Sequence, residues 1–114
     1  MEPTSPFIGT NVPFYDLIAP DVLPFEIGNA LTAMMKKSAL KKGEVTSAWE
    51  AVQQIPVDLR HTDIKSALKI ATKFNIYAYD AYFLECADSL RSPLLTLDSG
   101  MKTIAKEMGI TIWE

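Results

Sequence analysis

Apolar residues recur along the chain with the spacing of one helix face in five separate segments. In each segment they fall at i, i+3, i+4 and i+7, which is the repeat of an amphipathic α-helix. The predicted helices span residues 21–37, 44–54, 63–74, 79–91 and 98–108. We expect Gly109 to end the last helix, because glycine commonly follows a helix C-terminus.

Short apolar runs separate the predicted helices. They lie at residues 17–19, 55–59, 93–97 and 110–113. Such runs are typical of strands buried on both faces, and parallel strands are normally joined through helices. The alternation predicts an α/β fold that is rich in helix, with a small and mostly parallel sheet.

The first sixteen residues do not follow this pattern. They contain Pro3, Pro6, Gly9 and Pro13, which interrupt regular structure. We expect an irregular arm at residues 1–16, in which residues 7–12 form a short strand at most. The remaining residues, 17–114, have the length of one domain.

Composition narrows the function classes. Hydrophobic residues make up 48% of the chain, which is typical of a globular domain. The net charge is −3, which argues against binding of nucleic acid through bulk positive charge. A single Cys and a single His exclude an internal disulfide and the usual structural zinc sites. Neither a signal peptide nor an apolar run of about 20 residues is present, which predicts a soluble, cytoplasmic protein with no membrane partner.

Three acidic residues lie near predicted junctions between strands and helices: Glu26, Asp80 and Asp98. Ligands of open α/β sheets collect beyond the carboxyl ends of the strands. Carboxylates without His or Cys suit Mg²⁺ or Mn²⁺, which can activate water for phosphoryl chemistry. Asp98 could equally be a helix N-cap and Asp80 could favour a helix dipole, so the pattern alone leaves both interpretations open.

Several motifs occur in the order found in one family. Residues 19–31 (APDVLPFEIGNAL) resemble a strand followed by that family's Glu-x-x-Asn-x-Leu helix. Residues 76–85 (IYAYDAYFLE) resemble its Tyr-Asp-Ala segment, and residues 93–98 (PLLTLD) resemble its Leu-x-Thr-x-Asp strand end. Over residues 17–114 the sequence resembles the PIN domain, the fold of many bacterial toxin ribonucleases.

The resemblance implies a three-layer α/β/α sandwich with a divalent-metal site. Glu26, Asp80 and Asp98 match acidic positions that hold Mg²⁺ or Mn²⁺, and Asn29 and Thr96 match supporting positions. In such enzymes the ions position water for in-line attack on an RNA phosphodiester. The implied protein is a toxin endoribonuclease that a protein antitoxin restrains.

The N-terminus departs from the family pattern. Family members begin with a strand that ends in Asp and is followed by a helix, and here Gly9 stands where that Asp belongs. The resemblance therefore implies an N-terminally shortened domain with weak activity. Three explanations stay open: residues 7–12 substitute for the strand, a second copy covers the open edge in a homodimer, or the chain is a shortened form of a longer protein.

Two functions follow from these observations. The first is a Mg²⁺- or Mn²⁺-dependent ribonuclease that uses the three remaining acids. The second is a catalytically silent, PIN-like remnant that acts as a binding or dimerisation module.

Overall fold

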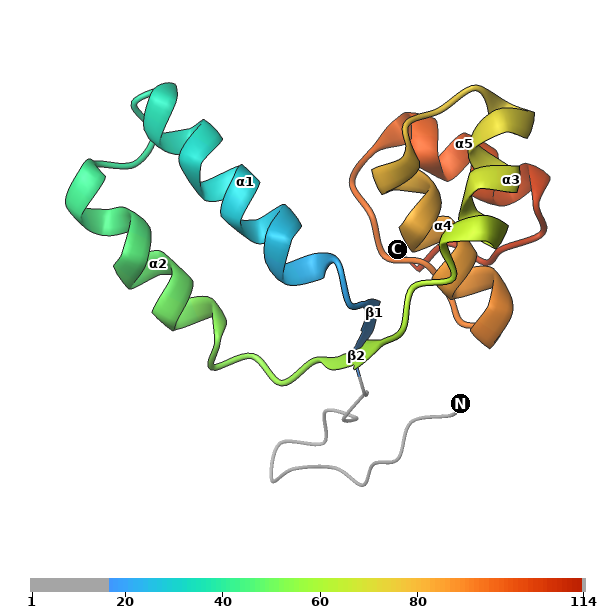
Figure 1. Cartoon of the computed structure of the whole chain (residues 1–114), viewed down its shortest axis with the longest axis horizontal. Helices are drawn as coiled ribbons and strands as arrows, with labels where there is room; N and C mark the ends of the chain where they lie inside the picture. Colours follow the sequence, from blue (N-terminus) through green and yellow to red (C-terminus); the bar gives the residue numbers. More distant parts are fainter. Residues whose placement is uncertain (1–16, 114) are drawn as a thin grey trace.

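The computed structural model describes residues 17–113, so the predicted arm at 1–16 and its strand at 7–12 lie outside the described residues. The elements in chain order are β1 (Ile18–Pro20), α1 (Leu23–Lys36), η1 (Lys42–Glu44), α2 (Val45–Val52), β2 (Asp58–Arg60), α3 (Ile64–Phe74), α4 (Ala78–Leu90) and α5 (Ser99–Glu107) (Figure 1). All five predicted helices are confirmed, with boundaries within two residues of those expected. Gly109 follows the end of α5 with a φ of 80°, as expected for a glycine beyond a helix C-terminus.

The sheet is parallel but very short. β1 pairs with β2 over three residues each, with Ala19 opposite Leu59 at the centre. A second parallel pairing is a single bridge between Leu94 and Ile112. The predicted mixed α/β fold with a small parallel sheet is therefore confirmed, and it is consistent with a PIN-like α/β/α arrangement.

The strands differ from the predicted apolar runs for local reasons. The run at residues 55–59 pairs only from Asp58, because the Ile55 N–H still bonds the Val52 carbonyl in the turn that ends α2. The run at 93–97 gives one bridge, because the Asp98 N–H bonds the Thr96 hydroxyl and turns the chain toward α5. The run at 110–113 likewise pairs at one residue within the described part of the chain.

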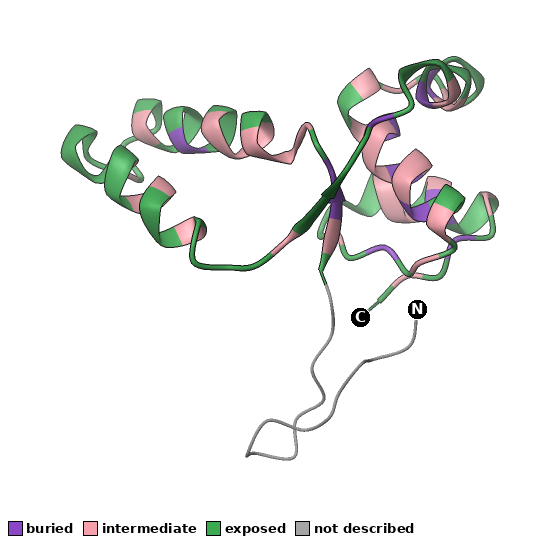
Figure 2. Ribbon diagram, turned by 60° about the horizontal axis from the view of Figure 1, so that its bottom comes forward, coloured by how far each residue is buried: buried purple, intermediate pink, exposed green. Residues whose placement is uncertain are grey.

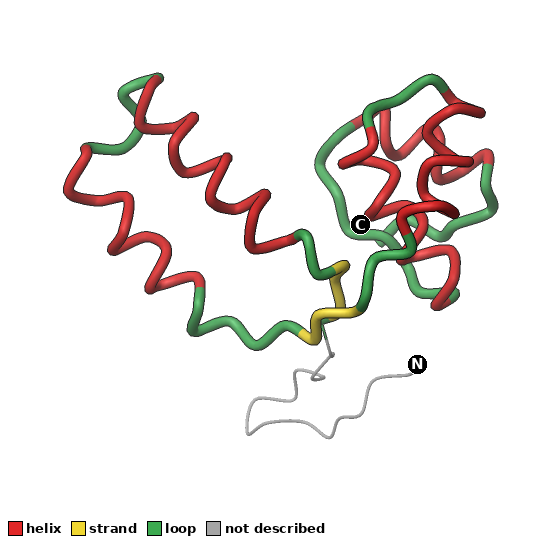
Figure 3. The backbone as a smooth tube through the Cα atoms, in the orientation of Figure 1, coloured by secondary structure: helices red, strands yellow, loops and turns green. Residues whose placement is uncertain are grey.

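The elements form two groups on either side of β1 and β2 (Figures 1 and 3). Helices α1 and α2 make an antiparallel hairpin that projects from one side, and they contact each other. Helices α3, α4 and α5 pack together on the other side with the C-terminal segment. The main buried cluster comprises Leu84, Ala87, Leu94, Ala105 and Ile110.

The apolar stripes of α1 and α2 are less buried than their pattern suggests (Figure 2). Leu31 is the buried residue of α1, whereas Met34 on the same stripe is 42% exposed. Helix α2 has no buried residue. Among the described elements, α2 is the main helical neighbour of α1, and a two-helix hairpin buries less of each stripe than a packed core does.

Within residues 17–113, none of the helices combines the length and apolar character needed to cross a membrane.

The packing of α4 generates a stability prediction. Leu84 is completely buried, so Leu84→Ala should lower the free energy of unfolding by about 2–5 kcal/mol through lost burial and a residual cavity. Leu97 is 95% exposed, so the matched change Leu97→Ala should alter it by about 0.5 kcal/mol at most. Urea unfolding followed by circular dichroism measures both, and equal effects of the two changes would contradict this description of the core.

Candidate active site

Asp98 is fixed at the start of α5 by three local features. Its Oδ1 accepts a hydrogen bond from the Met101 N–H at 3.1 Å, so it is the N-cap of the helix. Its own N–H donates to the Thr96 Oγ1 at 3.1 Å. A Cβ at Gly100 would lie 3.2 Å from Asp98 Oδ1, so glycine at this position leaves room for the carboxylate. Thr96 therefore contacts Asp98 directly, and Gly100 is a neighbour that the sequence pattern did not reveal.

Asp80 lies in the first turn of α4, on a different element from Asp98. Its side chain is half-buried, and the loss of solvent raises the pKa of the Asp80 carboxyl group. The negative charge of Asp98 raises that pKa further. The structure thus brings two of the predicted acids close enough for their charges to interact.

Glu26 and Asn29 lie on α1, a different element from those that carry Asp80 and Asp98. Glu26 is half-buried in the first turn of the helix, and Asn29 is exposed one turn later. The Asn29 backbone carbonyl accepts a hydrogen bond from the Thr32 hydroxyl at 3.1 Å. Across residues 17–113, no three Asp, Glu, His or Cys side chains gather closely enough to form a metal cluster. The assignment of the whole set to a metal site, Glu26, Asp80, Asp98, Asn29 and Thr96, remains a prediction.

A polar contact that the sequence analysis missed joins the carboxyl ends of β1 and β2. The buried Thr62 hydroxyl donates to Asp21 Oδ1 at 2.6 Å, and the Asp21 N–H donates to the Arg60 carbonyl at 2.8 Å. The available signal was a polar residue shortly after each of two apolar runs. This contact ties the strand ends together, and it occupies one oxygen of a further carboxylate, Asp21.

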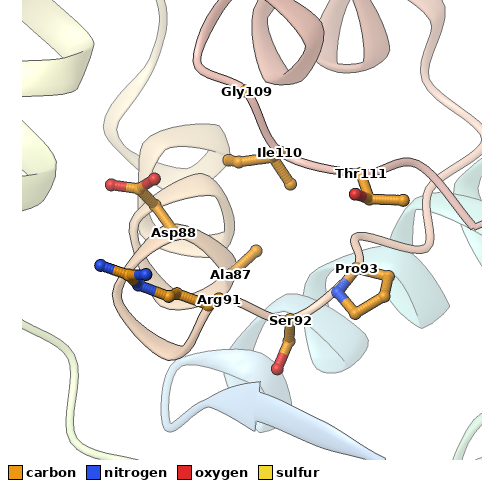
Figure 4. A pocket seen from close by; sticks show the side chains of 8 residues that line it. All are labelled: Ala87, Asp88, Arg91, Ser92, Pro93, Gly109, Ile110 and Thr111. Carbon is orange, nitrogen blue, oxygen red and sulfur yellow. The ribbon is translucent and has the colours of Figure 1, made fainter. Parts of the chain in front are cut away.

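A pocket of about 490 Å³ lies at the opposite end of α4 from Asp80 (Figure 4). Its lining comes from the last turn of α4, the segment leading to Leu94 and the turn after α5, and comprises Ala87, Asp88, Arg91, Ser92, Pro93, Gly109, Ile110 and Thr111. None of the predicted site residues lines it. Ser92 and Pro93, which precede Leu94, line the pocket. Neither Asp80 nor Asp98 lines it, so the pocket and the acid pair are separate features.

Comparison with protein families identifies the chain. A family model described as the PIN domain matches residues 8–107. The chain belongs to the PIN domain family. PIN domains are generally nucleases that bind RNA and use divalent metal ions. The match begins at residue 8, within the segment 7–12. A comparison with curated proteins found no match.

The PIN-domain acid pair generates a pH prediction. Because the pKa of Asp80 is raised in the folded state, protonation of Asp80 stabilises the fold. This stabilisation is fully present below the pKa of the unfolded chain, near pH 4, and is lost as the pH rises through the folded value. Asp80→Asn should therefore melt at a higher temperature than the wild-type chain at pH 7, and the difference should shrink toward pH 4.

Thermal melts between pH 4 and pH 8 measure this difference. Asp88→Asn changes an exposed acid on the same helix and serves as the matched control. A Tm difference for Asp80→Asn that does not vary with pH would contradict the proposed cause.

Proposed function

We propose that this PIN domain is a divalent-metal-dependent endoribonuclease of the toxin type, which hydrolyses RNA phosphodiesters. The observation that carries the proposal is the interaction between Asp80 and Asp98 across two separate elements. Two like charges held together, one of them partly desolvated, are costly unless a cation or a proton is bound between them. The arrangement thus favours a site that takes up positive charge.

The donor set fits Mg²⁺ or Mn²⁺. Both ions prefer carboxylate oxygens, and the helix cap occupies only Oδ1 of Asp98, which leaves Oδ2 as a ligand. The bound ion would supply charge neutralisation and an activated water for phosphodiester hydrolysis. Thr96 holds the backbone of Asp98 and thereby fixes where its carboxylate lies.

Glu26 is the proposed third metal ligand, with Asn29 beside it as a supporting group. Two residues separate the end of β1 from the start of α1, and β1 contacts α4, the helix that carries Asp80. The start of α1 is therefore connected through β1 to the element that supports the acid pair. Glu26 would supply a third carboxylate to a cation held by Asp80 and Asp98.

Exposed apolar side chains next to the proposed acids support a single-stranded RNA substrate. Phe25 precedes Glu26 and is 70% exposed, and Tyr77 lies one turn before Asp80 and is 85% exposed. Unpaired bases stack on such aromatic rings without needing a positively charged surface at every contact. The same exposed rings would offer a protein antitoxin an apolar surface close to the site.

A second function has its own support. Within residues 17–113 the acids form a pair and not a cluster of three, and Gly9 stands where the family resemblance expects an Asp. Both observations favour a binding or dimerisation module that has lost catalysis.

Cleavage of a labelled single-stranded RNA with Mg²⁺ or Mn²⁺ separates the two functions. The wild-type chain should cleave the RNA, and Asp80→Asn combined with Asp98→Asn should reduce cleavage to the level of buffer alone. Asparagine also caps helices well, so the change at residue 98 should keep the start of α5 intact.

Asp88→Asn serves as the control, and it should keep wild-type cleavage because Asp88 lies at the other end of α4. Unchanged cleavage by the double variant would contradict the site assignment. A folded wild-type chain that cleaves no RNA would favour the binding module.

A further inference from the structure

Positive charge is concentrated at the connection between α1 and α2, which is the end of the hairpin farthest from β1 and β2 (Figure 1). Four exposed lysines form this lysine tip: Lys36, Lys37, Lys41 and Lys42. They are four of the eleven Lys and Arg residues of the chain, and residues 27–43 contain no Asp or Glu. The tip is therefore strongly basic although the whole chain has a net charge of −3.

A tight turn holds the two lysine pairs next to each other. The Ala39 and Leu40 N–H groups both donate to the Met34 carbonyl, at 2.8 and 3.3 Å, so the connection folds back against the last turn of α1. The Lys41 N–H donates to Glu44 Oε1 at 2.8 Å, which directs the nearest following carboxylate to the backbone. Within residues 17–113, no lysine of the tip forms an ion pair. The four ammonium groups can therefore meet an anionic partner.

Helix dipoles explain only half of the lysine tip. Lys36 and Lys37 lie at the C-terminal end of α1, where the dipole stabilises cations. Lys41 and Lys42 precede α2, at the positive end of its dipole, where cations are not stabilised. The repulsion between four like charges held at one turn is relieved when anionic groups bind to them.

An exposed stripe on α1 connects the lysine tip to Glu26, the proposed third metal ligand. Its residues recur at intervals of three or four and share one helix face: Phe25, Asn29, Thr32 and Lys36. Phe25 precedes Glu26, and Lys36 lies about 16 Å farther along the helix axis. The stripe offers an aromatic ring for base stacking at one end and positive charge at the other, as in proteins that bind single-stranded nucleic acid.

We propose that the lysine tip and the exposed stripe of α1 bind the RNA strand beyond the bond that is cleaved. The inference rests on the proposed ribonuclease function, because Glu26 places the start of the stripe beside the site of cleavage. An RNA strand carries one negative charge per nucleotide, so it presents several phosphates to the four lysines. These phosphate contacts raise affinity for RNA and do not select a base sequence.

Binding of RNA in EDTA tests the hairpin apart from cleavage. The probe is a fluorescein-labelled oligouridylate, followed by fluorescence anisotropy over a series of KCl concentrations. A tip variant that combines Lys36→Ala, Lys37→Ala, Lys41→Ala and Lys42→Ala should weaken binding. It should also lower the slope of log K against log[salt] by about 3, since each lost phosphate contact on a single strand removes ~0.7. Alanine favours helix, so α1 and α2 should stay folded, which circular dichroism checks. The same four lysines changed to Arg should keep wild-type binding, because the charge is retained.

A matched variant separates position from bulk charge. It changes four exposed lysines of α3 and α5, and combines Lys65→Ala, Lys69→Ala, Lys73→Ala and Lys106→Ala. Net charge falls equally in both variants, so the matched variant should lose less affinity and less slope than the tip variant. Equal losses in the two variants, or wild-type RNA binding by the tip variant, would overturn the proposal.

Cleavage assays with Mg²⁺ distinguish failure of this inference from failure of the proposed function. Tip-dependent RNA binding in EDTA without any cleavage in Mg²⁺ would refute the ribonuclease and leave the hairpin as an RNA-binding surface. Cleavage together with wild-type RNA binding by the tip variant would refute the hairpin alone. Asp80→Asn combined with Asp98→Asn should bind RNA in EDTA at least as tightly as the wild-type chain. Tip-dependent sedimentation with phosphatidylserine vesicles, without RNA binding, would overturn the proposal in favour of a lipid surface.

Discussion

The packing of helix α4 is the constraint on which the rest of the described structure depends. Its buried residues, Ala81, Leu84 and Ala87, recur every three positions and face two different clusters. Ala81 meets the alanines of α3, and Leu84 and Ala87 meet Leu94 and the alanine of α5. Small side chains allow close approach of neighbouring helices, so a thirteen-residue helix can support α3, α5, β1 and the Leu94 segment at once.

The acid pair is a consequence of this packing. Asp80 lies at the N-terminal end of α4, and Asp98 follows Leu94, which packs against the same helix. Each aspartate has a local structural role, one in a first helical turn and the other as an N-cap. The partial desolvation of Asp80 and the repulsion between the two carboxylates both disfavour the ionised form of Asp80. Neither effect is needed for a first-turn acid or for an N-cap. A bound cation would offset both costs, which connects the stability of the domain to its proposed chemistry.

Local patterns predicted the local features of the fold. Helices were located correctly because their apolar repeats and capping residues, such as Asp98, lie within a few positions of each other. Strand lengths were not predictable, because pairing depends on partners far along the chain and on turns at Ile55 and Thr96. The hydrogen bond between Thr62 and Asp21 joins residues 41 positions apart, which spacing alone cannot reveal.

The same limit applies to the helical stripes and to the site. A stripe shows that a face is apolar and does not identify what covers it, as the exposed Met34 on α1 demonstrates. Family resemblance selected Asp80 and Asp98, and in the structure the charge of Asp98 adds to the desolvation that raises the pKa of Asp80. The assignment of both acids to a metal site stays a prediction. Glu26 lies on α1, which packs against α2, so its position relative to the pair follows from tertiary structure and not from its motif.

Binding of Mn²⁺ to the purified chain, followed by electron paramagnetic resonance, tests the central claim most directly. If Asp80 and Asp98 form a cation site, the wild-type chain will bind Mn²⁺ saturably and Mg²⁺ will displace it. Asp80→Asn combined with Asp98→Asn will abolish that binding, and Asp88→Asn will preserve it. Equal Mn²⁺ binding by the wild-type chain and the double variant, or no saturable binding by the folded wild-type chain, would contradict the account.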